Sequence, residues 1–177
     1  EDYHKKHPLK PGAPKEEVRS KFLGKTRVKI VEELFKYMKD RDYLKIERET
    51  IALRDFEVRL TEQQKSIADR IEEEFIKENC NPPRPETILN NKEEEQVFQA
   101  LVDWGSLIKI GEEIYFHKAT YENSIIILKE YLKAHKEINA AKYRDLLKTS
   151  RKFAIALLEK FDQEKITKRK GDKRTLY

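Results

Sequence analysis

Apolar residues recur at helical spacing in several stretches of this chain, and each series leads into a short hairpin of alternating residues. Ile67, Ile71 and Phe75 lie four residues apart, which places them on one face of a predicted helix. Leu107 to Ile110 and Ile114 to Phe116 flank Gly111 and Glu112, a pattern typical of two strands joined by a two-residue turn. The pattern predicts a mainly α chain with small β-hairpins (α+β).

The order of helices followed by a hairpin occurs three times. The first strands of the hairpins begin at Leu44, Leu107 and Ile166, about 60 residues apart, and a fixed period of this kind indicates repeated structural units. Turns are expected at Glu49-Thr50, Gly111-Glu112 and Gly171-Asp172. Glycine is expected to supply the positive φ that such turns require in the second and third hairpins.

Helices are predicted ahead of each hairpin. Before the first hairpin, helices are expected at residues 15–22 and 26–39. Before the second, we expect a helix that opens at 60–64, a short helix at 85–89 and a helix that ends near Gly105. Before the third, helices are expected at 121–134, 140–147 and 150–165, with a short strand at 137–139. Helix, short helix, helix and hairpin is the order of a winged helix. We therefore predict a tandem array of winged-helix domains: 1–59, an acidic domain at 60–118, and a basic domain at 119–177.

The charge distribution separates the three predicted domains, called here the first, second and third modules. The 177 residues are 40% charged with a net charge of +5, and the modules carry +4, −6 and +7 in chain order. A polyanion is attracted to the third module and repelled by the second. The acidic surface of the second module is also what a merely solvated protein face would show.

Residues suited to catalysis or metal binding do not form a recognisable pattern. The single cysteine, Cys80, excludes an internal disulfide and a paired-cysteine zinc site. The four histidines lack neighbouring ligands at metal-binding spacing, and the five glycines form no phosphate-binding loop. No secretion signal or membrane-length apolar run is present. We expect no enzyme activity, metal or cofactor in this segment, no membrane association, and a reduced cytoplasmic location.

The third module carries the strongest functional signal. Thr149 or Ser150 is a good helix N-cap, so Arg151 and Lys152 fall in the first helical turn, where positive charges oppose the helix dipole and a bound anion would offset them. A basic hairpin follows. The predicted nucleic-acid contacts are Lys148, Thr149, Ser150, Arg151, Lys152, Lys168, Arg169, Lys170, Gly171 and Arg174.

Two further features of the third module bear on this prediction. The helix that follows Ser150 is expected to bury Phe153, Ala156, Leu157 and Phe161 and to turn Ile155, Glu159 and Asp162 away from the core. Tyr143 and Tyr177 suit either base stacking or core packing.

These segments resemble a known family. Residues 139–147, 149–162 and 166–174 are similar to the last winged helix of the bacterial selenocysteine-specific elongation factors, the SelB family. Residues 3–19 resemble the start of an earlier winged helix of that family, and residues 56–64 resemble a module junction. The family pattern often has a glycine near position 164–165, which is absent here.

The resemblance implies a role in translation. SelB proteins carry GTPase domains that bind GTP, Mg²⁺ and selenocysteinyl-tRNA, and their C-terminal winged helices bind the selenocysteine insertion sequence (SECIS), an mRNA hairpin beside an in-frame UGA codon. By this resemblance residues 149–152 would engage phosphates, and the hairpin around Arg169, Lys170, Gly171 and Arg174 would hold a loop or bulged base. We expect the segment to be a monomer. Its expected partner is the mRNA hairpin, and the ribosome and selenocysteinyl-tRNA would be reached through the full-length protein.

Two other classes remain open from the sequence. Winged helices often insert their third helix into duplex DNA, which would favour a transcription regulator, although Glu159 and Asp162 would then face the DNA. The acidic second module would suit a protein-interaction scaffold.

Overall fold

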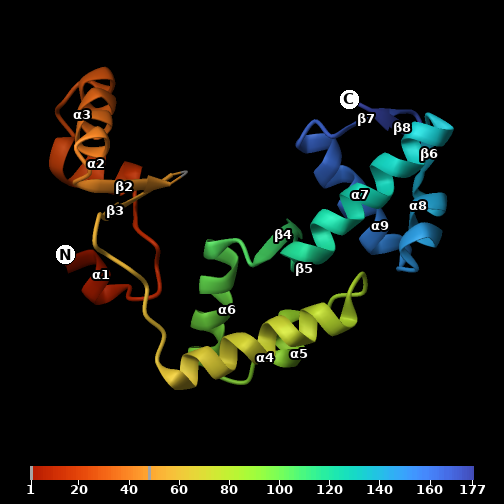
Figure 1. Ribbon diagram of the computed structural model, residues 1–177, viewed down its shortest axis with the longest axis horizontal. Helices are drawn as coiled ribbons and strands as arrows, with labels where there is room; N and C mark the ends of the chain where they lie inside the picture. Colours follow the sequence, from red (N-terminus) through yellow and green to blue (C-terminus); the bar gives the residue numbers. More distant parts are fainter. Residues whose placement is uncertain (1, 48) are drawn as a thin grey trace. The chain divides into compact units, whose positions relative to one another are not determined.

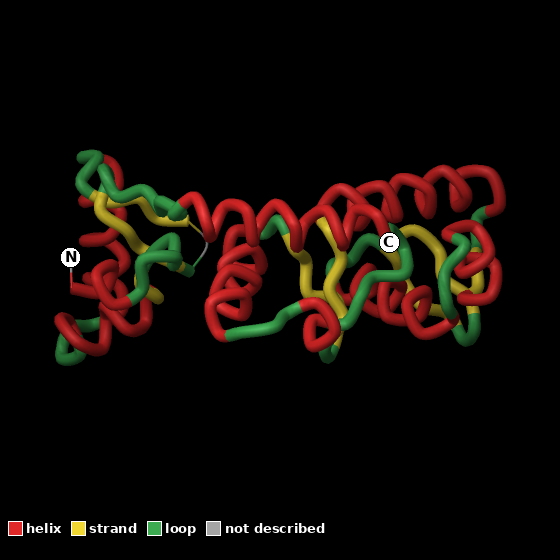
Figure 2. Tube along the Cα trace, turned by 90° about the horizontal axis from the view of Figure 1, so that it is seen from below, coloured by secondary structure: helices red, strands yellow, loops and turns green. Residues whose placement is uncertain are grey.

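In the computed structural model, which describes residues 2–47 and 49–177, helices lead into an antiparallel hairpin three times along the chain (Figure 1). The chain divides into two compact units, Glu1–Gln63 and Gln64–Tyr177. The first unit holds the first module and residues 60–63, and the second unit holds the rest of the second module and the third. Figure 2 shows that the strands form small separate sheets. The predicted fold class, a mainly α array of winged helices, is confirmed.

In its described residues the first module contains α1 (Asp2–Lys6), β1 (Ala13–Pro14), α2 (Lys15–Leu23), α3 (Val28–Asp40), β2 (Leu44–Glu47) and β3 (Thr50–Leu53). Its three-stranded sheet has the order β1-β3-β2, and its core is Val31, Phe35 and Ile51. The short helix α1 is absent from the sequence prediction. Thr50, predicted as a turn residue, is the first residue of β3 and pairs with Glu47. Arg48, in the same predicted hairpin, lies outside the described residues.

The second module comprises α4 (Glu62–Glu78), α5 (Pro85–Ile88), α6 (Lys92–Trp104), β4 (Leu107–Gly111) and β5 (Ile114–His117). Gly105 ends α6 with φ of 82°, as its position predicted. Gly111 does not supply the positive φ of the hairpin turn; Glu113 does, with φ of 54°. The reason is a register shift between Lys109 and Gly111 that pairs Gly111 with Ile114, so the turn lies one residue later than predicted.

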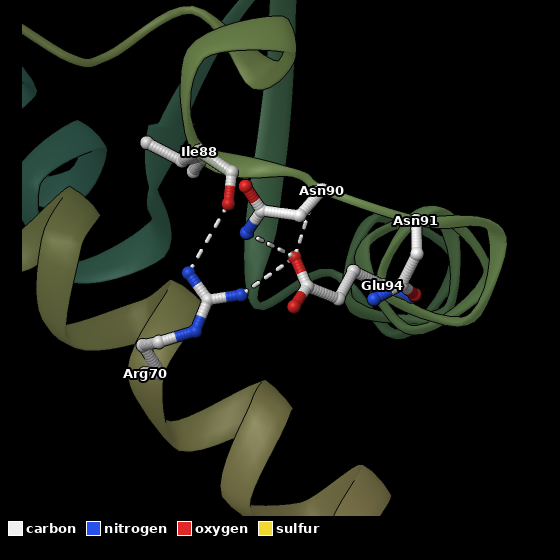
Figure 3. A network of polar contacts seen from close by, with 5 residues as sticks. All are labelled: Arg70, Ile88, Asn90, Asn91 and Glu94. Atoms are coloured by element: carbon white, nitrogen blue, oxygen red, sulfur yellow. Dashed lines mark hydrogen bonds and ion pairs between the residues drawn. The ribbon is translucent and has the colours of Figure 1, made fainter.

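A polar network joins three segments of the second module (Figure 3). Arg70 of α4 donates from Nη1 to the carbonyl oxygen of Ile88 (3.1 Å) and lies 2.8 Å from Oε2 of Glu94. The backbone N–H of Asn90 donates to the same carboxylate (2.9 Å), and the amide of Asn91 caps α6 by accepting from the N–H of Glu94 (3.0 Å). The backbone N–H of Asn90, together with the Arg70 charge and the Asn90 side chain, holds the pKa of the buried Glu94 carboxyl below its usual range, against the opposing effect of burial.

The third module comprises α7 (Lys118–His135), β6 (Ile138–Asn139), α8 (Ala140–Leu147), α9 (Arg151–Gln163), β7 (Thr167–Lys170) and β8 (Lys173–Leu176), with the sheet order β6-β8-β7. Asn139 caps α8 by accepting from the N–H of Lys142 (2.8 Å), and Ser150 caps α9 by accepting from that of Phe153 (3.3 Å). The predicted helices at 140–147 and 150–165 are thus confirmed within one or two residues.

The second and third modules share one hydrophobic core. Cys80, Ile110, Ile114 and Phe116 of the second module belong to the same buried cluster as Leu128, Tyr143 and Leu157 of the third. No loop separates the modules, because β5 ends at His117 and α7 begins at Lys118, with His117 Nδ1 accepting from the N–H of Ala119 (3.3 Å). The described residues contain no helix long and apolar enough to span a membrane.

Candidate nucleic-acid interface

The hairpins of the second and third modules differ in which of their side chains are buried and which are exposed. In the second module, Leu107, Ile110, Ile114 and Phe116 are all buried, so that hairpin is part of the core shared by the two modules. In the third module, the β7–β8 hairpin, called the wing, exposes Lys168, Arg169, Lys170 and Lys173. The wing therefore presents four basic side chains to solvent, whereas the hairpin of the second module presents one, Lys109.

The segment that leads into α9, residues 148–152 and called here the tip, exposes its cations. Ser150, one of the two predicted caps, is the residue that caps the helix. Arg151 and Lys152 follow in the first helical turn, and both are exposed, as is Lys148. Positive side chains beside the unpaired N–H groups of a helix start create a local site for an anion.

Thr149 occupies a different position from its neighbours in the tip. Its Oγ1 donates toward the carbonyl oxygen of Cys80 and lies 3.2 Å from Oδ1 of Asn81, both in the second module. The amide Nδ2 of Asn81 in turn donates to the carbonyl oxygen of Lys148 (3.3 Å). The structure therefore directs the Thr149 side chain toward protein and leaves Lys148, Ser150, Arg151 and Lys152 on the solvent side.

The turn of the wing is held by a hydrogen bond between a wing side chain and the backbone of the turn. Gly171 has φ of 60°, and Nε of Arg169 donates to its carbonyl oxygen (3.0 Å), so the Arg169 side chain is held over the turn. Lys173 pairs with Glu137, which precedes β6. Lys168, Arg169 and Lys170 are thus exposed along the strand that leads into the glycine turn, and RNA contact by them stays a prediction.

Arg174 does not join this exposed group. Its Nε lies 2.9 Å from Oδ2 of Asp162, and the side chain is 5% exposed. Thr167 donates to the other oxygen of Asp162 (2.6 Å). Asp162, expected to face away from the core, is half-buried and joins α9 to the wing. Arg174 therefore has a structural ion pair where an RNA contact was predicted.

The buried face of α9 is also rotated from the predicted one. The buried residues are Ala154, Leu157, Leu158 and Phe161, whereas Phe153 and Ala156 are only partly buried and pack at the edge of the core. Phe153 instead meets Phe116 of the second module edge to face, with ring centres 6.0 Å apart. This contact was not predictable from the third module alone.

The tip and the wing lie near opposite ends of α8. Asn139, the N-cap of α8, is paired with Lys173 of the wing, and Lys148, the C-cap, begins the tip. Nine residue steps at 1.5 Å each separate these caps by about 13 Å. The prediction placed the two basic groups side by side. The structure brings them onto one module but separates them by the length of this helix.

The two tyrosines proposed for stacking also differ. Tyr143 is fully buried, its hydroxyl donates to the carbonyl oxygen of Ser124 (2.8 Å), and burial raises its pKa, so it belongs to the core. Tyr177 is 71% exposed just after β8, at the end of the wing opposite the Gly171 turn. Within the described residues, no group of three or more His, Cys, Asp or Glu side chains is arranged to hold a metal.

Two family models match the chain. Both are described as elongation factor SelB, winged helix; one matches residues 1–53 and the other residues 130–176, and together they cover more than half of the chain. The selenocysteine-specific elongation factor of Desulfomicrobium baculatum is 29% identical over 99% of this chain. The chain spans 28% of that relative's length.

Two solved structures share the fold. The mRNA-binding domain of elongation factor SelB from E. coli, solved in complex with SECIS RNA, aligns with a TM-score of 0.56 and 21% identity, covering 66% of this chain and 98% of that one. The bacterial selenocysteine-specific elongation factor EF-Sec aligns with a TM-score of 0.54 and 23% identity, covering 94% of this chain and 26% of that one.

Proposed function

This chain belongs to the winged-helix region of the SelB elongation factor family, and from that premise we propose that its third module binds an mRNA hairpin, the selenocysteine insertion sequence. The observation that carries the proposal is the contrast between the two hairpins of the second unit. One buries its apolar residues in the core shared by the modules and exposes one basic residue, Lys109, whereas the other exposes four basic residues beside a glycine turn. The related E. coli domain, which shares this fold, was solved with SECIS RNA.

The separation of tip and wing suits a folded RNA. The major groove of an RNA helix is too deep and narrow for protein side chains to read, so sequence-specific proteins read loops and bulges while contacting nearby phosphates. Arg151 and Lys152 of the tip would neutralise backbone phosphates on the stem. The wing, beyond the other end of α8, would reach the loop, and Tyr177, at the end of the wing opposite its turn, has an exposed ring for a displaced base.

The same proposal assigns no chemistry to this segment. Binding through cations and an aromatic ring needs no cofactor, and the GTP, Mg²⁺ and selenocysteinyl-tRNA of the family would belong to a GTPase region outside these residues. The segment would act as a monomeric, non-catalytic arm of a cytoplasmic translation factor. On the ribosome it would hold that region near a recoded UGA codon.

A pair of double substitutions tests the proposal. Arg151→Ala with Lys152→Ala removes two tip cations, whereas Lys65→Ala with Lys77→Ala removes two exposed cations from the second module and changes the net charge equally. The tip pair should weaken hairpin binding about tenfold or more and lower the salt slope of log K by about 2, because each lost phosphate contact lowers it by about 1. Equal effects from both pairs would contradict it.

A further inference from the structure

The second module contacts the tip through polar groups at the end of α4. Asn81 donates from Nδ2 to the carbonyl oxygen of Lys148 (3.3 Å), and the Thr149 hydroxyl lies between the Cys80 carbonyl oxygen and Asn81 Oδ1. Cys80 itself is buried in the shared core. Two adjacent residues of one module thus bind two adjacent residues of the other.

The residue that receives the Asn81 bond has an unusual backbone. Lys148 adopts a left-handed conformation with φ of 51°, and its N–H bonds to the carbonyl oxygens of Arg144 and Asp145 at the end of α8. A non-glycine residue rarely adopts this conformation without outside support. The bond from Asn81 to its carbonyl group supplies support at the point where the chain turns from α8 into α9.

A second contact holds the other side of the tip. Phe153, immediately after Lys152, meets the buried ring of Phe116 on β5 edge to face. The second module therefore contacts residues 148, 149 and 153, while Arg151 and Lys152 between them remain exposed. A site whose backbone is fixed before binding loses less conformational freedom when the ligand arrives.

We infer that Asn81, in the acidic second module, is a positioning residue for RNA binding by the third, an inference that rests on the proposed function. It acts by fixing the backbone of Lys148 and, through Thr149, the direction from which α9 presents Arg151 and Lys152. In this arrangement the Thr149 side chain contacts the second module, and RNA contacts the neighbouring residues of the tip. The second module contributes to affinity without carrying a favourable charge for RNA.

The test compares hairpin affinity of the full chain with Asn81→Ala, Thr149→Val and both together. Loss of one such hydrogen bond is worth a factor of about five in an equilibrium constant, so each single variant should bind about fivefold more weakly. The double variant should bind no more than about tenfold more weakly, because both changes remove one connected contact. The matched controls are Thr87→Val, which removes a hydroxyl that donates to the carbonyl oxygen of Arg84 at the N-cap of α5, and Asn123→Ala on the exposed face of α7.

Two additional readouts separate positioning from simple stability. Affinities are measured where circular dichroism shows every variant fully folded. Amide hydrogen exchange is measured without RNA at residues 148, 149, 153 and 154, whose N–H groups are hydrogen-bonded. Positioning predicts faster exchange there in Asn81→Ala, and unchanged exchange in α4.

Wild-type affinity in both single variants, with the wild type itself binding the hairpin, would overturn the inference and leave the proposed function standing. Losses that multiply in the double variant would also overturn it, because they would mean that Asn81 and Thr149 each contact RNA separately. Failure of the wild type to bind any hairpin would overturn the proposed function, and the inference with it.

Discussion

Nε of Arg174 lies 2.9 Å from Oδ2 of Asp162, and this ion pair connects β8 of the wing to the last turn of α9. Thr167 donates to the second oxygen of the same carboxylate, so both strands of the wing bond to one aspartate. The sign and position of Arg174 suggest an RNA contact, but its guanidinium is used inside the protein. This ion pair fixes the wing against α9, and the exposed charge of the wing lies on its other basic residues.

Arg174→Ala is expected to destabilise the third module rather than to remove an RNA contact. It leaves the half-buried Asp162 carboxylate without its cation, and we expect a loss of about 2 kcal/mol in the free energy of unfolding, below the 3–5 kcal/mol of a fully buried pair because Asp162 keeps partial access to water. Arg169→Ala, at an exposed position, should cost about 0.5 kcal/mol or less but weaken hairpin binding. Urea unfolding and RNA titration of both variants measure the contrast. The reverse pattern would restore Arg174 as a contact.

Two glycine-to-alanine substitutions compare the turn of the wing with the corresponding glycine in the hairpin of the second module. Gly171 has φ of 60° with open space around it, so Gly171→Ala is expected to strain the backbone by about 1 kcal/mol and to weaken RNA binding by changing the shape of the turn. Gly111 has no positive φ, and an added Cβ would make only ordinary contact with Ile114. Gly111→Ala should leave both stability and binding near wild type. Equal RNA affinities of the two variants would show that the wing turn does not contact the ligand.

The second module should lose stability in acid partly through one carboxylate. The pKa of Glu94 is held below its unfolded value, about 4.3, chiefly by the N–H of Asn90 and also by Arg70. Its contribution is therefore fully present above that value and is lost as the pH falls through the lower folded pKa. In Glu94→Gln, which does not titrate, stability should fall less steeply below about pH 4.3. Glu95→Gln, exposed on the same helix, should follow the wild type, and coincident curves for all three proteins would refute this assignment.

Tyr177 is expected to contribute a stacking surface for an unpaired base. Its ring is 71% exposed, and base stacking on an aromatic side chain is worth about 1–3 kcal/mol. Tyr177→Ala should weaken hairpin binding about tenfold, whereas Tyr177→Phe should bind like the wild type because the ring is kept. Tyr37→Ala, at an exposed ring of the first module, is the control. Loss of affinity in Tyr177→Phe would indicate a hydroxyl contact in place of stacking.

Local signals in the sequence predicted most of the fold. Gly105 ends α6, Ser150 caps α9, and Gly171 forms the wing turn, because each of these positions depends on one residue, through a left-handed backbone for the two glycines and a side-chain hydrogen bond for Ser150. The hairpin of the second module shows the limit of this reasoning. The register shift before Gly111 moved the positive φ to Glu113, and a shift of register leaves no trace in turn propensities.

The candidate site was predicted less completely than the fold, because several of its contacts join residues far apart in the sequence. Charge and capping identified the exposed Arg151, Lys152 and Arg169. The pairing of Arg174 with Asp162 and of Thr149 with Asn81 depends on how the wing packs on α9 and how the second module packs on the third. Asn81 itself stands before two prolines and gave no functional signal. Because the two modules share a core, residues 119–177 alone would expose the apolar side chains that pack against Phe116 in the full chain.

A titration of the full chain tests the central claim most directly. The ligands are a selenocysteine insertion hairpin, the same hairpin with its loop sequence scrambled, and a DNA duplex of equal length, each at several salt concentrations. The account predicts that the intact hairpin binds more tightly than both others at every salt concentration, since only loop contacts by the wing distinguish it while phosphate contacts are common to all three. Equal affinities with equal salt slopes would contradict the account and would reduce the third module to a general binder of polyanions.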